Sequence, residues 1–109
     1  MKVNSSTILD KSSIESEWIM EFKWDNHKAL INMKKHKISF QEAATIFADP
    51  LAMTFDDPDH SVGEHRILTF GTTRVGKTVV ISHTQTNNEV RLISARLMTK
   101  QERKMYEEG

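Results

Sequence analysis

Three arginines in the second half of the chain have the chemistry to bind a phosphate group. Arg91 and Arg96 lie in the stretch EVRLISAR (89–96), which reads as a β-strand, and Arg66 begins another strand-like stretch. A guanidinium group stays charged and binds two phosphate oxygens at once. We therefore expect Arg66 and Arg91 to hold a phosphate and stabilise its transition state, with Arg96 as a third such group.

Groups that transfer protons would complete such a site. His60, Glu64 and His83 are the candidates, because imidazole titrates near neutral pH and a carboxylate accepts a proton. The loop 56–66 is also rich in oxygen and nitrogen ligands, but its spacing matches neither a calcium loop nor H-E-x-x-H. We expect no metal and no cofactor. A metal-dependent nuclease that uses this loop is the alternative.

The spacing of the two strand arginines limits how they act together. Arg91 and Arg96 are five positions apart, so a regular strand would point them to opposite faces of a sheet. Both serve one site only if a bulge or the strand end turns one of them. An ion pair of Arg91 with Glu89 or Glu64 is the structural alternative to a phosphate contact.

Composition restricts the class of protein. The chain has 109 residues and 38% hydrophobic residues, which suits one domain with one core. It has no cysteine and no apolar run near the length of about 20 residues that spans a membrane. With no signal-like apolar run either, we expect a cytoplasmic protein without membrane contact. The net charge is zero, yet residues 61–106 carry an excess of basic residues, which permits a surface that binds a polyanion.

The elements that must position these residues follow from periodicity and caps. Residues 1–19 read as a loose polar extension, and residues 20–109 as the single domain. Met20, Phe22 and Trp24 share one side of a strand, and Asp25 caps a helix to about His36. In that helix Leu30 and Met33 form the expected apolar side. Capping boxes at 39–42 and 99–102 open a second helix and a short C-terminal helix.

Four strand-like stretches lie between these helices, near residues 51–55, 65–71, 77–84 and 89–96. Short turns between them predict antiparallel neighbours. The fold class is thus α+β, with an antiparallel sheet of four to five strands, two N-terminal helices on one face and a short C-terminal helix. We expect the face under the helices to carry Leu68, Phe70, Val79, Ile81, Val90 and Leu92, and the opposite face to carry Ile67, Thr69, Val80, Arg91 and Ala95.

Several blocks of the sequence resemble the BrnT family of bacterial toxins. They are the W-D-x-x-K of residues 24–28, the K-H of 35–36, the S-F-x-E-A of 39–43 and the I-S-A-R of 93–96, in that order. One departure is Lys37, where the family usually has a glycine that ends the helix in a left-handed conformation. The resemblance covers the chain from about Met20 to Glu108.

This resemblance implies a RelE-like fold and a ribonuclease toxin of a type II toxin–antitoxin system. Members are similar to metal-independent ribonucleases, in which the ribose 2′-OH attacks the adjacent phosphorus, and such cleavage inhibits translation. The implied partner is a BrnA-type antitoxin, similar to ribbon-helix-helix DNA-binding proteins, in a hetero-oligomer with the toxin. The alternative is a non-catalytic binding subunit that docks an antitoxin or nucleic acid.

Overall fold

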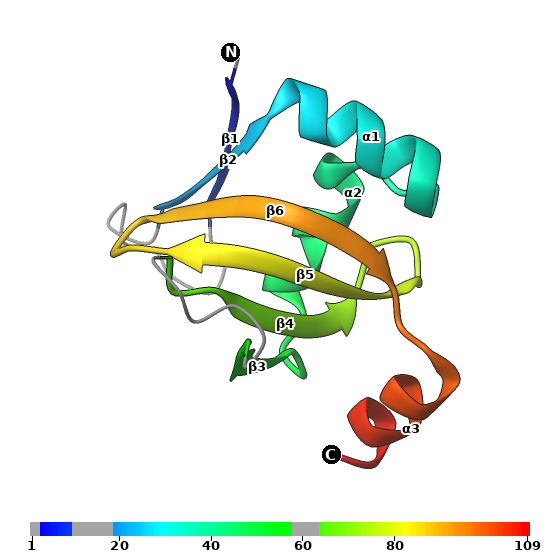
Figure 1. Ribbon diagram of the computed structural model, residues 1–109. Helices are drawn as coiled ribbons and strands as arrows, with labels where there is room; N and C mark the ends of the chain where they lie inside the picture. Colours follow the sequence, from blue (N-terminus) through cyan, green and yellow to red (C-terminus); the bar gives the residue numbers. More distant parts are fainter. Residues whose placement is uncertain (1–2, 10–18, 58–63) are drawn as a thin grey trace.

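The computed structural model of the protein describes residues 3–9, 19–57 and 64–109 (Figure 1). His60, one of the expected proton-transfer groups, lies outside these residues. In chain order the elements are β1 (Val3–Leu9), β2 (Ile19–Asp25), α1 (Asn26–His36), α2 (Phe40–Ala44), a 3-10 turn η1 (Thr45–Ala48), β3 (Met53–Asp56), β4 (Ile67–Thr72), β5 (Thr78–Gln85), β6 (Glu89–Leu97) and α3 (Lys100–Glu108). The class is therefore α+β, as expected.

The strands of the described residues form one mixed sheet in the order β1-β2-β6-β5-β4-β3. The expected purely antiparallel sheet is wrong, because β2 pairs with β6 in parallel, with Lys23 beside Arg91. Short turns predict only the pairing of consecutive strands, and β2 and β6 are far apart in the chain. Residues 3–9 form strand β1 against β2, so the expected loose conformation is wrong for this part of the extension. The helices α1 and α2 follow these two strands, which does not match the RelE-like arrangement with two N-terminal helices.

Helix α1 begins and ends by local hydrogen bonds. The Oδ1 of Asp25 accepts a hydrogen bond from the His27 amide at 2.7 Å, which confirms the expected N-cap. At the other end Lys37 has φ of 61°, and its amide donates to the Met33 carbonyl at 3.0 Å. The left-handed turn is thus formed without the glycine that usually favours it, at a cost of about 1 kcal/mol.

The side of α1 that faces the protein is not the expected one. Leu30 and Met33 are 66% and 49% exposed, whereas Asn32 is 5% exposed. The Asn32 side chain binds the free edge of β6, since its Nδ2 donates to the Ala95 carbonyl at 2.9 Å and its Oδ1 accepts from the Ala95 amide at 3.0 Å. A third bond runs from Nδ2 to the Ile38 carbonyl at 3.1 Å. One amide side chain thus replaces a neighbouring strand, which is why a polar residue points inward.

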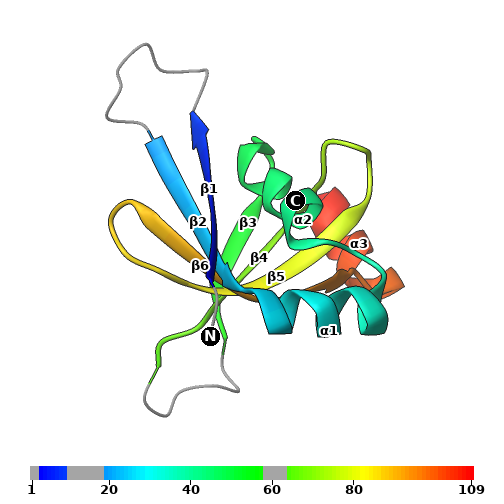
Figure 2. The same cartoon turned by 90° about the horizontal axis from the view of Figure 1, so that it is seen from above.

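The main core lies between α2, the inner side of α1 and one face of the sheet (Figure 2). Phe22 and Trp24 are buried there, as their alternation predicts, and Trp24 packs edge-on against Phe40 with ring centroids 5.9 Å apart. Val79, Ile81, Val90 and Leu92 also lie in this core. The expected places of these strand residues are confirmed.

Strand β4 is turned over relative to the expectation. Its register pairs Phe70 with Val80 and Thr69 with Ile81, so Leu68 and Phe70 lie on the sheet face away from α2. Thr69 lies on the core side instead, where its hydroxyl bonds the buried His83. Alternation sorts residues within one strand but does not say which set pairs with which set of the neighbour, so the sequence left this choice undetermined.

Helix α3 is tied down by polar side chains. The capping box of Thr99 and Glu102 is formed as expected, with both reciprocal hydrogen bonds present. The hydroxyl of Tyr106 donates to Asp49 and lies 2.9 Å from the hydroxyl of Thr72. A small second apolar cluster of Phe70, Val80 and Met98 packs beneath Tyr106. Among the described residues, no helix has the length and apolar character needed to cross a membrane.

Candidate active site

A β-bulge brings both strand arginines to one face of the sheet. Between β5 and β6 the register shifts, with His83 opposite Leu92 and Ser82 opposite Ser94, so one extra residue, Ile93, sits in β6. Arg91 then lies opposite Thr84 and Arg96 opposite Val80. These partners are four positions apart on β5, so the two arginines share a face although they are five apart in sequence. The same bulge turns Ala95 to the core side, against the expectation.

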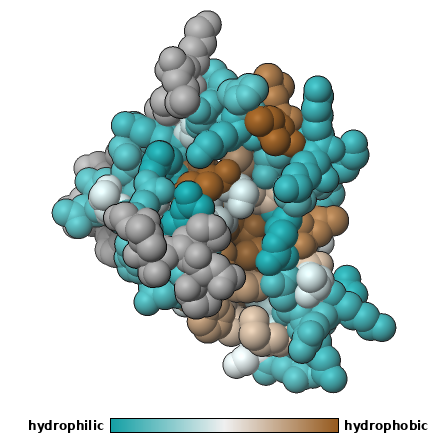
Figure 3. Space-filling view, viewed as in Figure 1, coloured by the Kyte–Doolittle hydropathy of each residue, from teal (hydrophilic) through white to brown (hydrophobic). Residues whose placement is uncertain are grey.

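We call this surface the open face: the side of the sheet away from α2, carrying Lys23, Leu68, Ser82, Thr84, Arg91 and Ser94. It looks toward the reader in Figure 1, with α2 behind the strands. Figure 3 shows apolar surface at the middle of this view, surrounded by hydrophilic side chains. A surface that offers both apolar and charged groups suits a ligand that has both rings and charges.

Glu64 joins two of the predicted arginines on the open face. A guanidinium nitrogen of Arg91 hydrogen-bonds one oxygen of Glu64, and the Nε of Arg66 lies 3.6 Å from the other oxygen. The backbone holds Arg66 in place, because its carbonyl accepts a hydrogen bond from the Asp57 amide at 3.0 Å. The side chains of Arg66, Arg91 and Glu64 are 28%, 46% and 41% exposed. Three of the predicted residues thus meet at one accessible place.

Lys23 is a cation of this site that sequence reasoning did not predict. It lies beside Arg91 across the parallel β2–β6 pair, and its Nζ is 2.8 Å from Glu89 and 3.4 Å from Glu21. Its hydrogen bonds to Glu89 and Glu21 raise its pKa above the ordinary value. Alternation with the buried Phe22 and Trp24 could have placed Lys23 on the opposite face. The parallel pairing that puts it beside Arg91 has no signal in the sequence.

Arg96 is on the open face but is engaged elsewhere. Its two terminal nitrogens bind the two oxygens of Glu102 at 2.7 and 2.9 Å. This fork, together with the bond from the Thr99 amide, holds the pKa of Glu102 at about 2. Arg96 lies about 13 Å from Arg91, from the rise per residue of an extended strand. The structure therefore joins Arg96 to α3 and not to the pair formed by Arg66 and Arg91.

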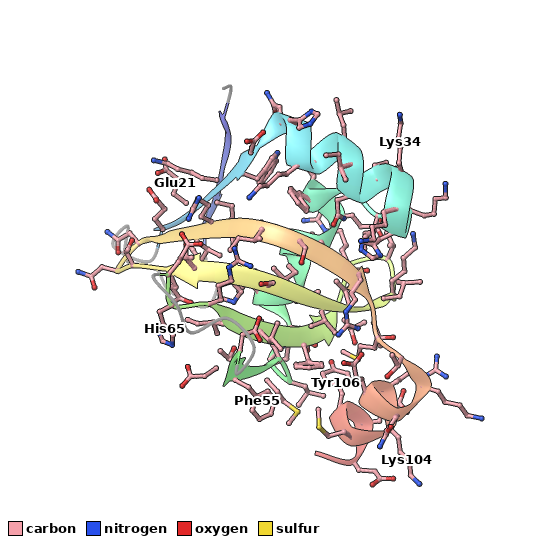
Figure 4. The ribbon with its side chains drawn as sticks, viewed as in Figure 1. Glu21, Lys34, Phe55, His65, Lys104 and Tyr106 are labelled. Carbon is pink, nitrogen blue, oxygen red and sulfur yellow. The ribbon has the colours of Figure 1, made fainter. Side chains whose placement is uncertain are left out.

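His83 is separated from the arginines by the sheet itself. It lies on the core side, fully buried, with Nε2 2.7 Å from the Thr69 hydroxyl and its ring against Phe47. Burial lowers its pKa below the ordinary value, so the ring is neutral at pH 7. His65, by contrast, is exposed and bonds Asp56 at 3.0 Å. Figure 4 shows His65 and Glu21 at the end of the sheet away from Tyr106.

Comparison with known proteins gives the family. A family model described as the ribonuclease toxin BrnT of type II toxin–antitoxin systems matches residues 24–102, well over half of the chain. The chain belongs to this family. A solved structure, the Brucella abortus ribonuclease toxin BrnT, is similar with a TM-score of 0.49 and 17% identity, over 71% of this chain and 94% of that one. No curated protein sequence matches.

Membership of the BrnT family gives the site a context. A toxin of a type II system has a protein antitoxin as its partner, and the family is named for ribonuclease activity. In this BrnT-family chain the residues Arg66, Arg91 and Glu64 all fall inside the matched range, whereas Lys23 precedes it. Among the described residues, no group of three His, Cys, Asp or Glu side chains is placed to hold a metal ion.

Proposed function

We propose that this BrnT-family toxin is an endoribonuclease that cleaves RNA on its open face without a metal ion. The observation that carries the proposal is the convergence of Arg66 and Arg91 on one carboxylate, Glu64. A carboxylate presents two oxygens to a guanidinium group much as a phosphate does. Two arginines whose guanidinium groups meet at one carboxylate are therefore spaced to bind two oxygens of one phosphate.

The chemistry follows from this arrangement. When an RNA phosphate takes the place of the carboxylate on the guanidinium groups, Glu64 becomes free to accept the proton of the ribose 2′-OH. The 2′ oxygen forms a bond to phosphorus, and the bond from phosphorus to the 5′ oxygen breaks. The 5′ oxygen receives a proton from an acid, for which His60 remains the candidate, and a 2′,3′-cyclic phosphate results. Arg66 and Arg91 stabilise the negative charge that develops on the phosphorane, and Lys23 binds the neighbouring phosphate.

Replacement of Arg91 tests the proposal. We expect Arg91→Ala to lower the rate of RNA cleavage at least about 100-fold, the loss usual for removing one charged group that stabilises a transition state. Because Arg91 is half exposed, the thermal midpoint should stay close to that of the wild type. Arg103→Ala, on the exposed side of α3, is the matched control and should cleave normally. Full activity of Arg91→Ala would show that the active site does not include Arg91. Cleavage that stops in excess chelator would instead support the metal-dependent alternative.

In the cell we propose that RNA cleavage inhibits translation in the cytoplasm and that a BrnA-type antitoxin with a ribbon-helix-helix domain neutralises the toxin. Expression of the wild type alone should stop growth, Arg91→Ala should not, and coexpression of the antitoxin should restore growth. The antitoxin is identified by coexpressing the neighbouring gene and observing that growth is restored. Binding of that antitoxin to operator DNA tests the ribbon-helix-helix assignment.

A non-catalytic binding subunit is the second candidate. It is favoured by the pairing of Lys23, Arg66, Arg91 and Arg96 with carboxylates, since a neutralised surface is typical of a structural role. Growth arrest that is equally strong in wild type and Arg91→Ala, with no cleaved RNA in either, would support this candidate. Cleaved RNA that depends on Arg91 would exclude it.

A further inference from the structure

The outer side of α1 exposes apolar side chains that the rest of the chain does not cover. Leu30 is 66% exposed, and Ile31 and Met33 are each 49% exposed. We call these three residues the α1 ridge. Asn32 and Ala29 form the inner side of the helix, so a large part of each ridge side chain stays open to a partner. Three large apolar side chains on one short helix are a common sign of a binding surface.

The charge around the α1 ridge has one sign. From residue 26 to residue 37 the chain carries four basic residues and no acidic residue: Lys28, Lys34, Lys35 and Lys37. Lys34 lies one turn from both Leu30 and Ile31, at helical spacings of four and three. Figure 4 shows Lys34 pointing away from the sheet, and Figure 3 shows apolar surface over α1 bordered by hydrophilic surface. A ligand that fits must therefore offer apolar side chains together with negative charge.

The position of α1 relates this surface to the proposed active site. The helix runs along β6, held there by the bonds between Asn32 and Ala95. It lies at the edge of the open face, and its apolar surface is visible from the same side (Figure 3). A polypeptide segment bound to α1 could thus continue over the strand that carries Arg91. RNA is a poorer fit, because phosphates would pair with the lysines but leave the ridge exposed.

We infer that the α1 ridge and its lysines form the docking surface for an acidic amphipathic segment of the protein antitoxin. In such a segment apolar side chains at spacings of three and four pack on Leu30, Ile31 and Met33, while carboxylates face the lysines. The apolar contacts supply the affinity, and the charges raise the rate of association. The surface is separate from Arg66 and Arg91, so this inference and the proposed function can fail independently.

The test replaces the ridge while keeping the helix. Leu30→Gln with Ile31→Gln substitutes polar residues with adequate helix propensity at two exposed positions. We expect the Kd for the antitoxin of the neighbouring gene, measured by calorimetry with the full toxin chain, to rise about 100-fold. The antitoxin should then fail to restore growth, while RNA cleavage by the variant toxin alone stays at the wild-type rate. Leu51→Gln with Val75→Gln is the matched control, since both are exposed apolar residues outside α1, and it should bind normally.

Four results would overturn the inference. The first is antitoxin binding by the ridge variant with wild-type affinity. The second is weaker RNA cleavage by the variant alone, which would assign the surface to RNA. The third is a smaller mass in solution for the variant toxin than for the wild type, which would assign it to a second copy of this chain. The fourth is binding of the wild type, but not the variant, to vesicles containing anionic lipid. If the wild type binds antitoxin through the ridge but cleaves no RNA, this inference is supported and the proposed function is refuted.

Discussion

Asn32→Asp is a nearly isosteric change that should destabilise the protein strongly and in a pH-dependent way. The Nδ2 of Asn32 donates to two backbone carbonyls, those of Ala95 and Ile38, at 2.9 and 3.1 Å. A carboxylate would place an oxygen against both carbonyl oxygens, in a position that is 5% exposed. The introduced carboxyl is therefore forced to stay protonated in the folded state, which raises its pKa above the unfolded value of about 3.9.

The magnitude follows from the hydrogen bonds lost. A protonated carboxyl donates to only one of the two carbonyls, so one buried acceptor loses its partner at a cost of about 1–3 kcal/mol, even at low pH. Above pH 4 the unfolded chain releases the proton while the folded chain keeps it, so the free energy of unfolding falls as pH rises. The slope is about 1.4 kcal/mol per pH unit, or about 3 kcal/mol between pH 5 and pH 7. A domain of this size has about 5–15 kcal/mol in total.

Urea unfolding at pH 5 and pH 7 measures this effect as the difference between variant and wild type at each pH. Asn32→Ala is the control, because it removes the same three hydrogen bonds without adding a titratable group, and its loss should be equal at the two pH values. A loss for Asn32→Asp below about 1 kcal/mol at pH 7, or one that is the same at both pH values, would refute the role given to this side chain.

Two further substitutions test other contacts. Glu102→Gln should lower the free energy of unfolding by about 1 kcal/mol at pH 7, because the fork with Arg96 is partly exposed. Since the pKa of Glu102 is lowered to about 2, this stability is complete above about pH 4.5 and is lost as pH falls toward 2; equal losses at pH 7 and pH 3 would contradict the assignment. Gly71→Ala should cost about 1–3 kcal/mol, because the added methyl group would meet the Ile46 Cβ at 2.9 Å and the Asp49 carboxylate at 3.3 Å. An unchanged thermal midpoint would show that η1 can move away.

Local features of this chain could be predicted from the sequence alone. The N-cap by Asp25 and the capping box of Thr99 and Glu102 depend on groups within four residues of one another. Such interactions form in any arrangement of the rest of the chain, so the pattern is sufficient. The family resemblance was likewise carried by short blocks of sequence, and the family model confirms it.

The candidate site was predicted only in part. The bulge on which a shared face for the arginine pair depends is present, and so is the contact between Arg91 and Glu64 that was the alternative to a phosphate contact. Alternation along β5 places His83 on the apolar side of the sheet with Val79 and Ile81, and the structure confirms that side. Its contact with Thr69 depends on the register of β4, which the sequence does not give. Arg96 binds Glu102 on a helix whose position relative to the sheet has no sequence signal.

The sequence by itself determined most of the elements, the caps at Asp25 and Thr99, and the family of this protein. The tertiary structure decided the parallel pairing that sets Lys23 beside Arg91, the bulge at Ile93 and the inward turn of Asn32. These features arise where strands far apart in the chain compete for partners. The pairing that forms is the one whose register satisfies the most backbone hydrogen bonds and buries the apolar faces. That competition involves the whole chain at once, which is why the place where the arginines meet could not be read from their spacing.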